Sequence, residues 1–230
     1  MTDEKLPRSG YGRDVKASRS RAYASLLRWL GPWAKDKDRP TSVDRHVIAV
    51  PVGEPGDRPF EAWMFSPRDR EPFGAYVLCP GLHYEGPMDP RLSRFAEILA
   101  NAGILVLAPF LPDFLALRVD RRVIDDLDRA VSTLALDPRM PKDILPGIFS
   151  ISFGSLPSLS VAARRSDVGA VVVFGGYANF ETTVRFSLGF DHEGKRIDGK
   201  RDPLNQPVVF INLVEELVED PSERVTLVGA

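Results

Sequence analysis

Residues 147–157, Gly147-Ile-Phe-Ser-Ile-Ser152-Phe-Gly-Ser-Leu-Pro157, decide the fold. The stretch opens with a short apolar run, passes through a turn of small residues and continues into a segment with apolar residues at helical spacing. A short apolar run is typical of a strand buried in a sheet, and the segment after it is typical of a helix packed on that sheet. The stretch therefore predicts a strand, a sharp turn and a helix, with Ser152 at the turn.

The residues around Ser152 fit a nucleophile elbow, the strained turn in which some enzymes hold a reactive serine. The strain leaves room only for small residues two positions before and two positions after the serine. Ser150 and Gly154 occupy these positions, whereas each neighbouring serine has an Ile or a Phe two positions before it. Ser152 is therefore the expected nucleophile. A Ser/Gly helix entrance without catalysis is the simpler interpretation of the pattern alone.

Around this stretch the chain alternates short apolar runs with amphipathic segments. The runs suit strands buried on both faces of a parallel sheet, and they cover residues 75–79, 104–108, 148–151 and 170–174. Between the first two runs, Asp89 is a typical helix N-cap, Pro90 suits the first helical position and Gly103 ends the helix. Between the second and third, Asp120 is a candidate cap for another helix. The alternation predicts βαβ units in an α/β, mostly parallel sheet with helices on both faces.

Three segments precede this alternation. Residues 1–17 are polar and lack an apolar period, so we expect a flexible leader. Residues 43–50 and 60–65 predict an antiparallel pair of strands at the start of a single domain that spans residues 41–230. Residues 18–40 predict an amphipathic helix, broken at Gly31-Pro32, whose apolar stripe packs on the main body. That stripe comprises Ala22, Tyr23, Leu26, Leu27, Leu30 and Trp33.

Two later segments leave alternatives open. Residues 178–205 are polar and Gly-rich, and they fit either a cap above the sheet or a long surface loop. Residues 208–218 fit either a strand or a helix. The helix is favoured by the spacing of Phe210, Leu213, Val214 and Leu217.

A second Gly-rich turn, Cys79-Pro-Gly-Leu-His-Tyr-Glu-Gly86, follows the first parallel strand. In a fold with a serine nucleophile, this turn lies where a backbone N–H is needed to stabilise an oxyanion. We expect the N–H of Leu82 to be one donor and the N–H of Phe153, directly after the serine, to be the other. The substrate is expected to contact Gly81, His83 and Tyr84 of the same turn.

Taken together, these features resemble the α/β-hydrolase superfamily, and more loosely its dienelactone-hydrolase-like and esterase-like members. The resemblance covers about residues 43–180 and rests on Pro80-Gly-Leu-His83, Ser150-Ile-Ser-Phe-Gly154 and Val171-Val-Val-Phe-Gly-Gly-Tyr177. It implies a serine hydrolase that acts on an ester or related acyl bond of a small molecule. It also implies that a catalytic acid and then a catalytic histidine follow the serine, on loops after later strands.

The chain departs from that order in its histidines. His46 belongs to the early strands and His83 to the oxyanion turn, so only His192 follows the serine. His192 is the catalytic base that the order implies, although a solvated loop histidine is the simpler interpretation of its charged, Gly-rich surroundings. No convincing triad can be completed, because neighbouring Asp191 is poorly placed to orient His192. Glu215 and Glu216 rank slightly above the other candidate acids, since they follow the apolar run at 208–211. The candidates are Glu181, Asp191, Glu215, Glu216 and Asp220.

The sequence also stops about where the superfamily would still need a final strand, a histidine loop and a closing helix. Two explanations are open, a truncated chain or a degenerate active site. The second leads to an alternative function, a non-catalytic α/β-hydrolase-like protein that binds a ligand in the same pocket. An incomplete sheet would also expose an apolar edge, which favours association between copies of the chain.

Composition argues against several classes of function. The chain has 230 residues, a formal net charge of −2 and a pI near 6.0, so it has no overall basic field for nucleic acid. Its one cysteine, Cys79, suits a buried apolar role in a reducing, cytoplasmic compartment. No apolar run is long enough for an integral membrane segment. We expect no cofactor and no metal, because no dinucleotide fingerprint follows the early strands and Asp191-His-Glu193 is too compact to enclose an ion.

The N-terminal segment has a charge bias of its own. The first 40 residues carry ten Lys and Arg against five Asp and Glu. Such a bias is typical of a helix that contacts an acidic membrane surface or partner, while a solvated arm is the simpler interpretation.

Overall fold

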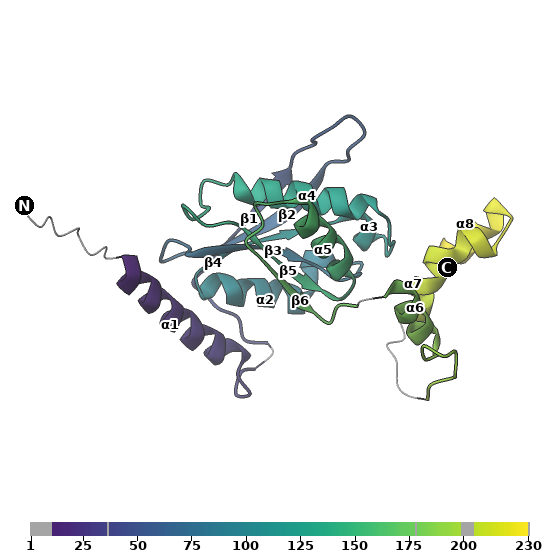
Figure 1. The fold of residues 1–230 in the computed structure, drawn as a ribbon, viewed down its shortest axis with the longest axis horizontal. Coiled ribbons are helices and arrows are strands. Elements are labelled where there is room, and N and C mark those ends of the chain that lie inside the picture. The colour runs from purple at the N-terminus through teal and green to yellow at the C-terminus, as the bar shows by residue number, and fades with distance from the viewer. Residues whose placement is uncertain (1–10, 36, 178, 199–204, 230) are drawn as a thin grey trace, which may run out of the picture.

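The computed structural model describes residues 11–35, 37–177, 179–198 and 205–229 (Figure 1). Helices cover both faces of a six-stranded sheet, while α1 extends from one side of it and α6 to α8 from another (Figure 1). The strands are β1 Val43–Val50, β2 Phe60–Pro67, β3 Gly74–Cys79, β4 Ile104–Pro109, β5 Gly147–Ile151 and β6 Ala170–Phe174. The helices are α1 Tyr11–Leu30, α2 Pro90–Asn101, α3 Pro112–Leu115, α4 Arg122–Ala135, α5 Ser155–Arg164, α6 Phe180–Leu188, α7 Asn205–Leu217 and α8 Pro221–Gly229.

The strand order of the sheet is β1-β2-β4-β3-β5-β6. β1 and β2 form the predicted antiparallel pair, with Val50 opposite Phe60. β3 pairs in parallel with β4 on one side and with β5 on the other, and β5 pairs in parallel with β6. The chain thus reverses its direction of travel across the sheet between β3 and β5. Open α/β sheets bind their ligands outside the carboxyl ends of strands at such a reversal.

Alternate residues of the central strands face opposite cores. On one face Met64, Val77 and Leu105 join a core with α4 and α5. On the other face their neighbours Phe65, Leu78 and Val106 join a core with α2. The face predicted for α4 is buried throughout, at Val123, Ile124, Leu127, Val131 and Leu134. The apolar face of α4 therefore packs against the strand residues Met64, Val77 and Leu105 in the first of these two cores.

Helix α2 starts and ends where its sequence predicts. The Asp89 carboxylate accepts hydrogen bonds from the N–H of Arg91 at 2.7 Å and of Leu92 at 3.4 Å, which satisfies two amides at the helix start. Pro90 is the first helical residue. Gly103 follows the end of the helix with φ +103°, a conformation that glycine adopts most easily. The N-terminus of α2 lies beside Ser152, because Asp89 and Arg91 line the same pocket as the serine.

Helix α1 differs from the prediction in its start and in its packing. It begins at Tyr11 and not near Ser18, so part of the expected leader is helical, and residues 1–10 lie outside the described residues. The apolar stripe splits into two rows. Ala22 is buried and Leu26 packs on the α2 core. The other row remains exposed, at Tyr23, Leu27, Leu30 and Trp33.

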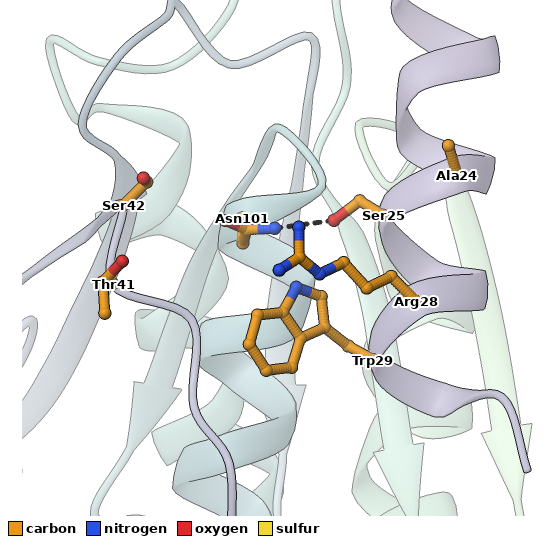
Figure 2. Close-up of a pocket in the computed structure, with 7 residues that line it drawn as sticks. All are labelled: Ala24, Ser25, Arg28, Trp29, Thr41, Ser42 and Asn101. Atoms are coloured by element: carbon orange, nitrogen blue, oxygen red, sulfur yellow. Dashed lines mark hydrogen bonds between the residues drawn. The ribbon is translucent and has the colours of Figure 1, made fainter. Parts of the chain in front are cut away.

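Polar contacts fasten α1 to α2. Asn101 donates a hydrogen bond to Ser25 Oγ at 2.7 Å (Figure 2). Arg94 of α2 donates to the carbonyl oxygens of Trp29, Lys35 and Asp38 at 2.8–3.1 Å. Figure 2 shows the Arg28 guanidinium beside the Trp29 ring, 5.4 Å from its centroid, in a cleft of about 310 Å³ between α1 and the body.

Strand β6 is not buried on both faces, which corrects the prediction for residues 170–174. Val172 is 39% exposed, Val173 43% and Phe174 68%. Among the described strands β6 has only β5 as a neighbour. The chain then leaves the sheet for α6 to α8, which stand off to one side and do not cover this edge (Figure 1). The apolar composition of residues 170–174 therefore predicted a strand correctly and its burial wrongly.

The C-terminal segments form helices. Residues 178–205 contain α6 and a turn closed by a bridge between Phe190 and Arg196. Helix α7 confirms the helical interpretation of residues 208–218. Asn212 of α7 accepts a hydrogen bond from Val119 N–H at 2.7 Å and donates to the Leu117 carbonyl at 2.8 Å, which ties α7 to the segment between α3 and α4. Within the described residues, no helix combines the length and the apolarity needed to cross a membrane.

A buried ion network joins the β1–β2 loop to α3 and α4. Arg58 donates hydrogen bonds to the buried carboxylates of Asp113 and Asp126, the latter at 2.8 Å. Arg129 also pairs with Asp126, at 2.6 Å, and donates to the Pro51 carbonyl at 3.0 Å. The hydrogen bond to Asp113 is the largest cause that raises the pKa of Arg58 above its ordinary value. The network holds the loop that leads into β2 against two helices.

Candidate active site

Ser152 has the backbone conformation of a nucleophile elbow. It follows β5 directly, lies one turn before α5 and has φ +50°. A non-glycine residue in this left-handed region is uncommon, because the conformation costs free energy. Residues strained in this way cluster at functional sites. The predicted strand, turn and helix are therefore present, with the strain located at Ser152.

Small residues around the elbow let two backbone segments approach each other. A Cβ on Gly154 would lie 2.5 Å from the Pro80 carbonyl oxygen, which is closer than real Cβ contacts allow. A Cβ on Gly81 would lie 3.2 Å from Ser152 Cβ. Ser150, the small residue before the serine, is buried and donates to the Val172 carbonyl at 3.3 Å. These contacts explain why the sequence has small residues on both sides of Ser152.

A pocket of about 330 Å³ opens beside Ser152. Its walls combine apolar side chains with four polar ones, and it is lined by Pro80, Gly81, Leu82, His83, Gly86, Asp89, Arg91, Leu92, Phe95, Ile151 and Ser152. A volume of this size suits a small-molecule ligand. The pocket lies between the turn after β3, the N-terminus of α2 and the elbow after β5, at the reversal of strand order described above.

The turn after β3 brings its backbone to the elbow. Leu82 and Gly81 both line the pocket with Ser152. Among the described residues, none accepts a hydrogen bond from the Leu82 N–H. Phe153 follows the serine at the entrance of α5 and packs edge-on against Tyr177, with ring centroids 5.3 Å apart.

His83 also lines the pocket, but its ring nitrogens are committed in a way that disfavours a role as base. Nδ1 accepts a hydrogen bond from the Glu85 N–H at 3.2 Å, so the neutral ring carries its proton on Nε2. Nε2 lies 3.6 Å from Asp89 Oδ2, and the ring stacks on Tyr84 with centroids 4.8 Å apart. His83 in this arrangement can donate a hydrogen bond to a ligand oxygen. It has no free lone pair for the proton of a serine hydroxyl.

The other histidines do not meet the serine. His192 lies on the exposed turn after α6, is 76% exposed and faces Glu193 at 3.8 Å. His46 lies on β1, opposite Met64 of β2, at the far side of the sheet from β5. Ser152 Oγ makes no hydrogen bond with any described residue. The arrangement observed thus contains an elbow and a pocket, and it brings no histidine into contact with the serine.

None of the candidate acids that can be located lines the pocket. Glu181 is 73% exposed and pairs with Arg185 at 2.8 Å. Asp191 accepts hydrogen bonds from backbone N–H groups of its own turn, and Asp220 accepts from Ser222. The side chains of Glu215 and Glu216 lie outside the described residues. Each located carboxylate has a local structural partner, which explains its position without catalysis.

Cys79 is buried beneath the elbow. Its Sγ lies 3.7 Å from the Gly154 carbonyl oxygen, and burial raises the pKa of its thiol to about 12. The thiol therefore stays protonated at neutral pH, as expected of an apolar packing residue.

The sequence did not identify Asp89, Phe95 and Tyr177 as neighbours of the site. Asp89 carries a helix-cap signal, and its carboxylate also holds Arg91 at 2.7 Å beside the pocket. The hydrogen bond from Arg91 is the largest cause that lowers the pKa of Asp89. Phe95 belongs to the apolar face of α2, so its pattern indicates only burial. Tyr177 ends the Val171–Tyr177 strand and turn, and only this position after β6 indicates that it lies near the site.

His83, Glu85 and Asp89 place three ligand-type atoms within 4.8 Å of one another. The Asp89 carboxylate is already used by two backbone amides and by Arg91. Binding a cation there would cost these contacts, so the group does not fit a metal as it stands.

Solved structures match this arrangement of strands and helices. An α/β hydrolase from Penicillium sp. sh18 is 18% identical, with a TM-score of 0.50 over 76% of this chain and 67% of that chain. An acylaminoacyl peptidase in complex with Z-Gly-Gly-Phe-chloromethyl ketone is 15% identical, with a TM-score of 0.50 over 74% of this chain and 29% of that chain. A dienelactone hydrolase from Anabaena variabilis is 23% identical, with a TM-score of 0.48 over 64% of this chain and 66% of that chain.

The chain spans less than two-thirds of the length of the dienelactone hydrolase and of the peptidase. No protein-family model matches the sequence, and no curated protein matches it either. Identities this low speak to the fold alone. The strand order, the elbow conformation and the match to the Penicillium structure agree, and the chain therefore has the fold of the α/β hydrolases.

Proposed function

We propose that the protein is a serine hydrolase of the α/β-hydrolase type that acts on an ester or related acyl bond of a small molecule. The observation that carries the proposal is Ser152 at φ +50°, which lines a pocket of about 330 Å³ and lies against the Gly81 backbone. A structure that serves only as a helix entrance has no need of strain at this residue.

In the proposed reaction Ser152 Oγ attacks the acyl carbon. The new Oγ–C bond forms as the carbonyl becomes an oxyanion, and the bond from carbon to the leaving oxygen then breaks. The proton of the serine hydroxyl departs with the leaving alcohol. Water hydrolyses the acyl-enzyme in a second, equivalent step and returns the proton to the serine. The N–H groups of Leu82 and Phe153 are assigned to the oxyanion, and the Nε2–H of His83 to an oxygen of the substrate.

Transfer of the serine proton needs a base, and we assign this role to His192. That histidine follows the serine in chain order, and it lies on an exposed turn outside the pocket. The assignment therefore requires the turn at residues 190–198 to close over Ser152 when substrate binds. Removal of His192 tests this requirement separately from the role of the serine.

A second function has one observation in its favour. Ser152 Oγ has no hydrogen-bond partner among the described residues, and a serine without a base is a weak nucleophile. In this alternative the chain is a non-catalytic protein that binds a small molecule in the same pocket. The two functions share the fold and differ only in whether the serine is activated.

Labelling with a fluorophosphonate probe separates the two functions, because the reagent reports an activated serine without assuming a substrate. We expect labelling of the full chain that is lost in Ser152→Ala. Ser160→Ala, on the same helix-forming segment, is the matched control and should label normally. A His192→Ala variant should label more slowly than the parent chain, while His83→Ala should keep the labelling and weaken turnover of a p-nitrophenyl ester.

Two results would overturn the assignment. Absence of labelling in protein that melts cooperatively would leave the binding function in place of the hydrolase. Labelling that survives in Ser152→Ala would show that another nucleophile reacts. Equal labelling of His192→Ala and the parent chain would remove His192 alone and leave the serine in its role.

A further inference from the structure

Helix α1 presents an apolar row to solvent. Tyr23, Leu27 and Leu30 are spaced i, i+4 and i+7, so they lie along one side of the helix. Their exposed fractions are 67%, 60% and 51%, and Trp33, just beyond the helix end, is 65% exposed. A parallel row one residue earlier, at Ala22, Leu26 and Trp29, is buried or half-buried against the body. The helix therefore has a second apolar side that its own domain does not cover.

The exposed row sits on the most basic part of the chain. Helix α1 contains five Lys and Arg against one Asp, a net charge of +4. The whole chain carries −2, so the other residues together carry −6. Arg19 is exposed and lies four residues before Tyr23, at the same side of the helix as the row. Positive charge and exposed apolar surface are thus concentrated on one element of an otherwise acidic protein.

We infer that α1 docks the protein on an anionic membrane surface, with Tyr23, Leu27, Leu30 and Trp33 inserted at the boundary between headgroups and acyl chains. Helices that lie in this boundary combine a basic polar side with aromatic and leucine residues on the other side. Tyr and Trp are favoured there, because each has an apolar body and a polar tip. The acidic remainder of the chain is repelled by such a surface, which orients the molecule with α1 toward it.

A second copy of the chain fits the same row less well. Two copies that met through this row would bring together two helices of net charge +4. Each would have to neutralise the repulsion of the other, and α1 contains a single acidic residue for this purpose. An anionic bilayer supplies the opposite charge and an apolar interior at once. The charge of α1 therefore selects the membrane over self-association.

Helix α1 is attached to the body, so binding of α1 to a membrane would hold the whole protein there. Asn101 bonds to Ser25, and Arg94 holds three carbonyls in and just after the last turn of α1. Arg28 and Trp29 point into the cleft between helix and body (Figure 2). The row can therefore enter a bilayer without breaking the contacts that hold the helix to α2.

The experiment is co-sedimentation of the full chain with vesicles. One set consists of phosphatidylcholine alone, and the other contains about one-third phosphatidylserine, which supplies the surface charge. We expect a partition coefficient at least about tenfold higher on the anionic vesicles, and a fall with added salt as the charge is screened. The double variant Leu27→Glu, Leu30→Glu should lose this binding. Leu136→Glu, at an 85% exposed leucine after α4, is the matched control and should bind like the parent.

Several outcomes would contradict the inference. Equal binding to both vesicle types, or unchanged binding of the double variant, would rule out the basic apolar helix as the cause. A concentration-dependent dimer that the double variant dissolves, together with no vesicle binding, would assign the row to self-association instead. Both variants replace exposed residues, so equal melting temperatures are expected and would show that a loss of binding is not a loss of fold.

Discussion

Gly81 packs against Ser152 so closely that a side chain at position 81 would begin 3.2 Å from the serine Cβ and 3.9 Å from its Oγ. The turn after β3 and the elbow after β5 are therefore fitted to each other at the atom proposed to react. A substitution at Gly81 is therefore the most direct test of whether the elbow geometry has a function.

Gly81→Val should slow fluorophosphonate labelling of Ser152. The added methyl groups enter the space beside Oγ, and displacement of a reacting atom by about 1 Å costs up to roughly a hundredfold in rate. Gly74→Val is the matched control, since a Cβ there meets no atom within 4 Å. Unchanged labelling kinetics in Gly81→Val would show that the approach of the two turns is irrelevant to reactivity.

Gly154→Ala should destabilise the fold. Its Cβ would lie 2.5 Å from the Pro80 carbonyl oxygen, and backbone cannot move aside as a flexible side chain can. Overpacking of this kind costs about 1–3 kcal/mol in the free energy of unfolding, which urea titration measures. A variant as stable as the parent chain would mean that the β3 turn and α5 are not tightly packed.

Arg58→Met should be more damaging than its partial exposure implies. The change leaves the buried carboxylates of Asp113 and Asp126 without their shared partner, although Arg122 and Arg129 remain nearby. We expect a loss of about 3 kcal/mol in unfolding free energy, the lower end of the range for a broken buried pair. Arg118→Met, at an exposed arginine, is the control. A loss under about 0.5 kcal/mol, typical of surface changes, would contradict the structural role of the network.

Arg94→Met should loosen α1 without unfolding the domain. The variant loses the donor to the carbonyls of Trp29, Lys35 and Asp38. Amide hydrogen exchange should accelerate in residues 19–38 and stay unchanged in β3 and β5, because local opening needs only the contacts of α1. The Arg118→Met chain again serves as control. Uniform acceleration over the whole domain would indicate that Arg94 supports the core and not the helix.

Asp89→Asn should flatten the acid limb of the stability curve. The hydrogen bond from Arg91 lowers the pKa of Asp89 below its ordinary value of 3.8 in the folded chain. The stability gained from the ionised carboxylate is present above pH 3.8 and is lost as the pH falls through the lowered folded pKa. Asn retains a side-chain oxygen for the helix cap but cannot titrate. Parallel acid limbs for the variant and the parent chain would contradict this contribution.

The elements that could be predicted are those whose signals are local. The cap at Asp89, the stop at Gly103 and the helical period of α4 depend on neighbours within a few positions, and the structure confirms them. Burial depends on what the rest of the chain brings to a surface. The row of Tyr23, Leu27 and Leu30 and the strand β6 are apolar yet exposed, and no periodicity distinguishes this from burial.

The candidate site divides in the same way. The small residues around Ser152 follow from backbone sterics, which the sequence records directly. The side-chain partners of the serine depend on loops whose course the sequence does not specify. His192 satisfies the order along the chain and lies on an exposed turn. His83 violates that order and lines the pocket, with its Nδ1 engaged by the Glu85 amide. Order along the chain is therefore a poor guide to distance here.

Helix α2 connects the pocket to the attachment point of α1. Its N-terminus borders the pocket at Asp89 and Arg91, and its last residue, Asn101, holds Ser25 of α1. A helix of this length separates its ends by about 1.5 Å per residue, which places the Ser25 contact a helix length away from the mouth of the pocket. A molecule anchored through α1 would accordingly keep its pocket at the opposite end of α2 from the point of attachment.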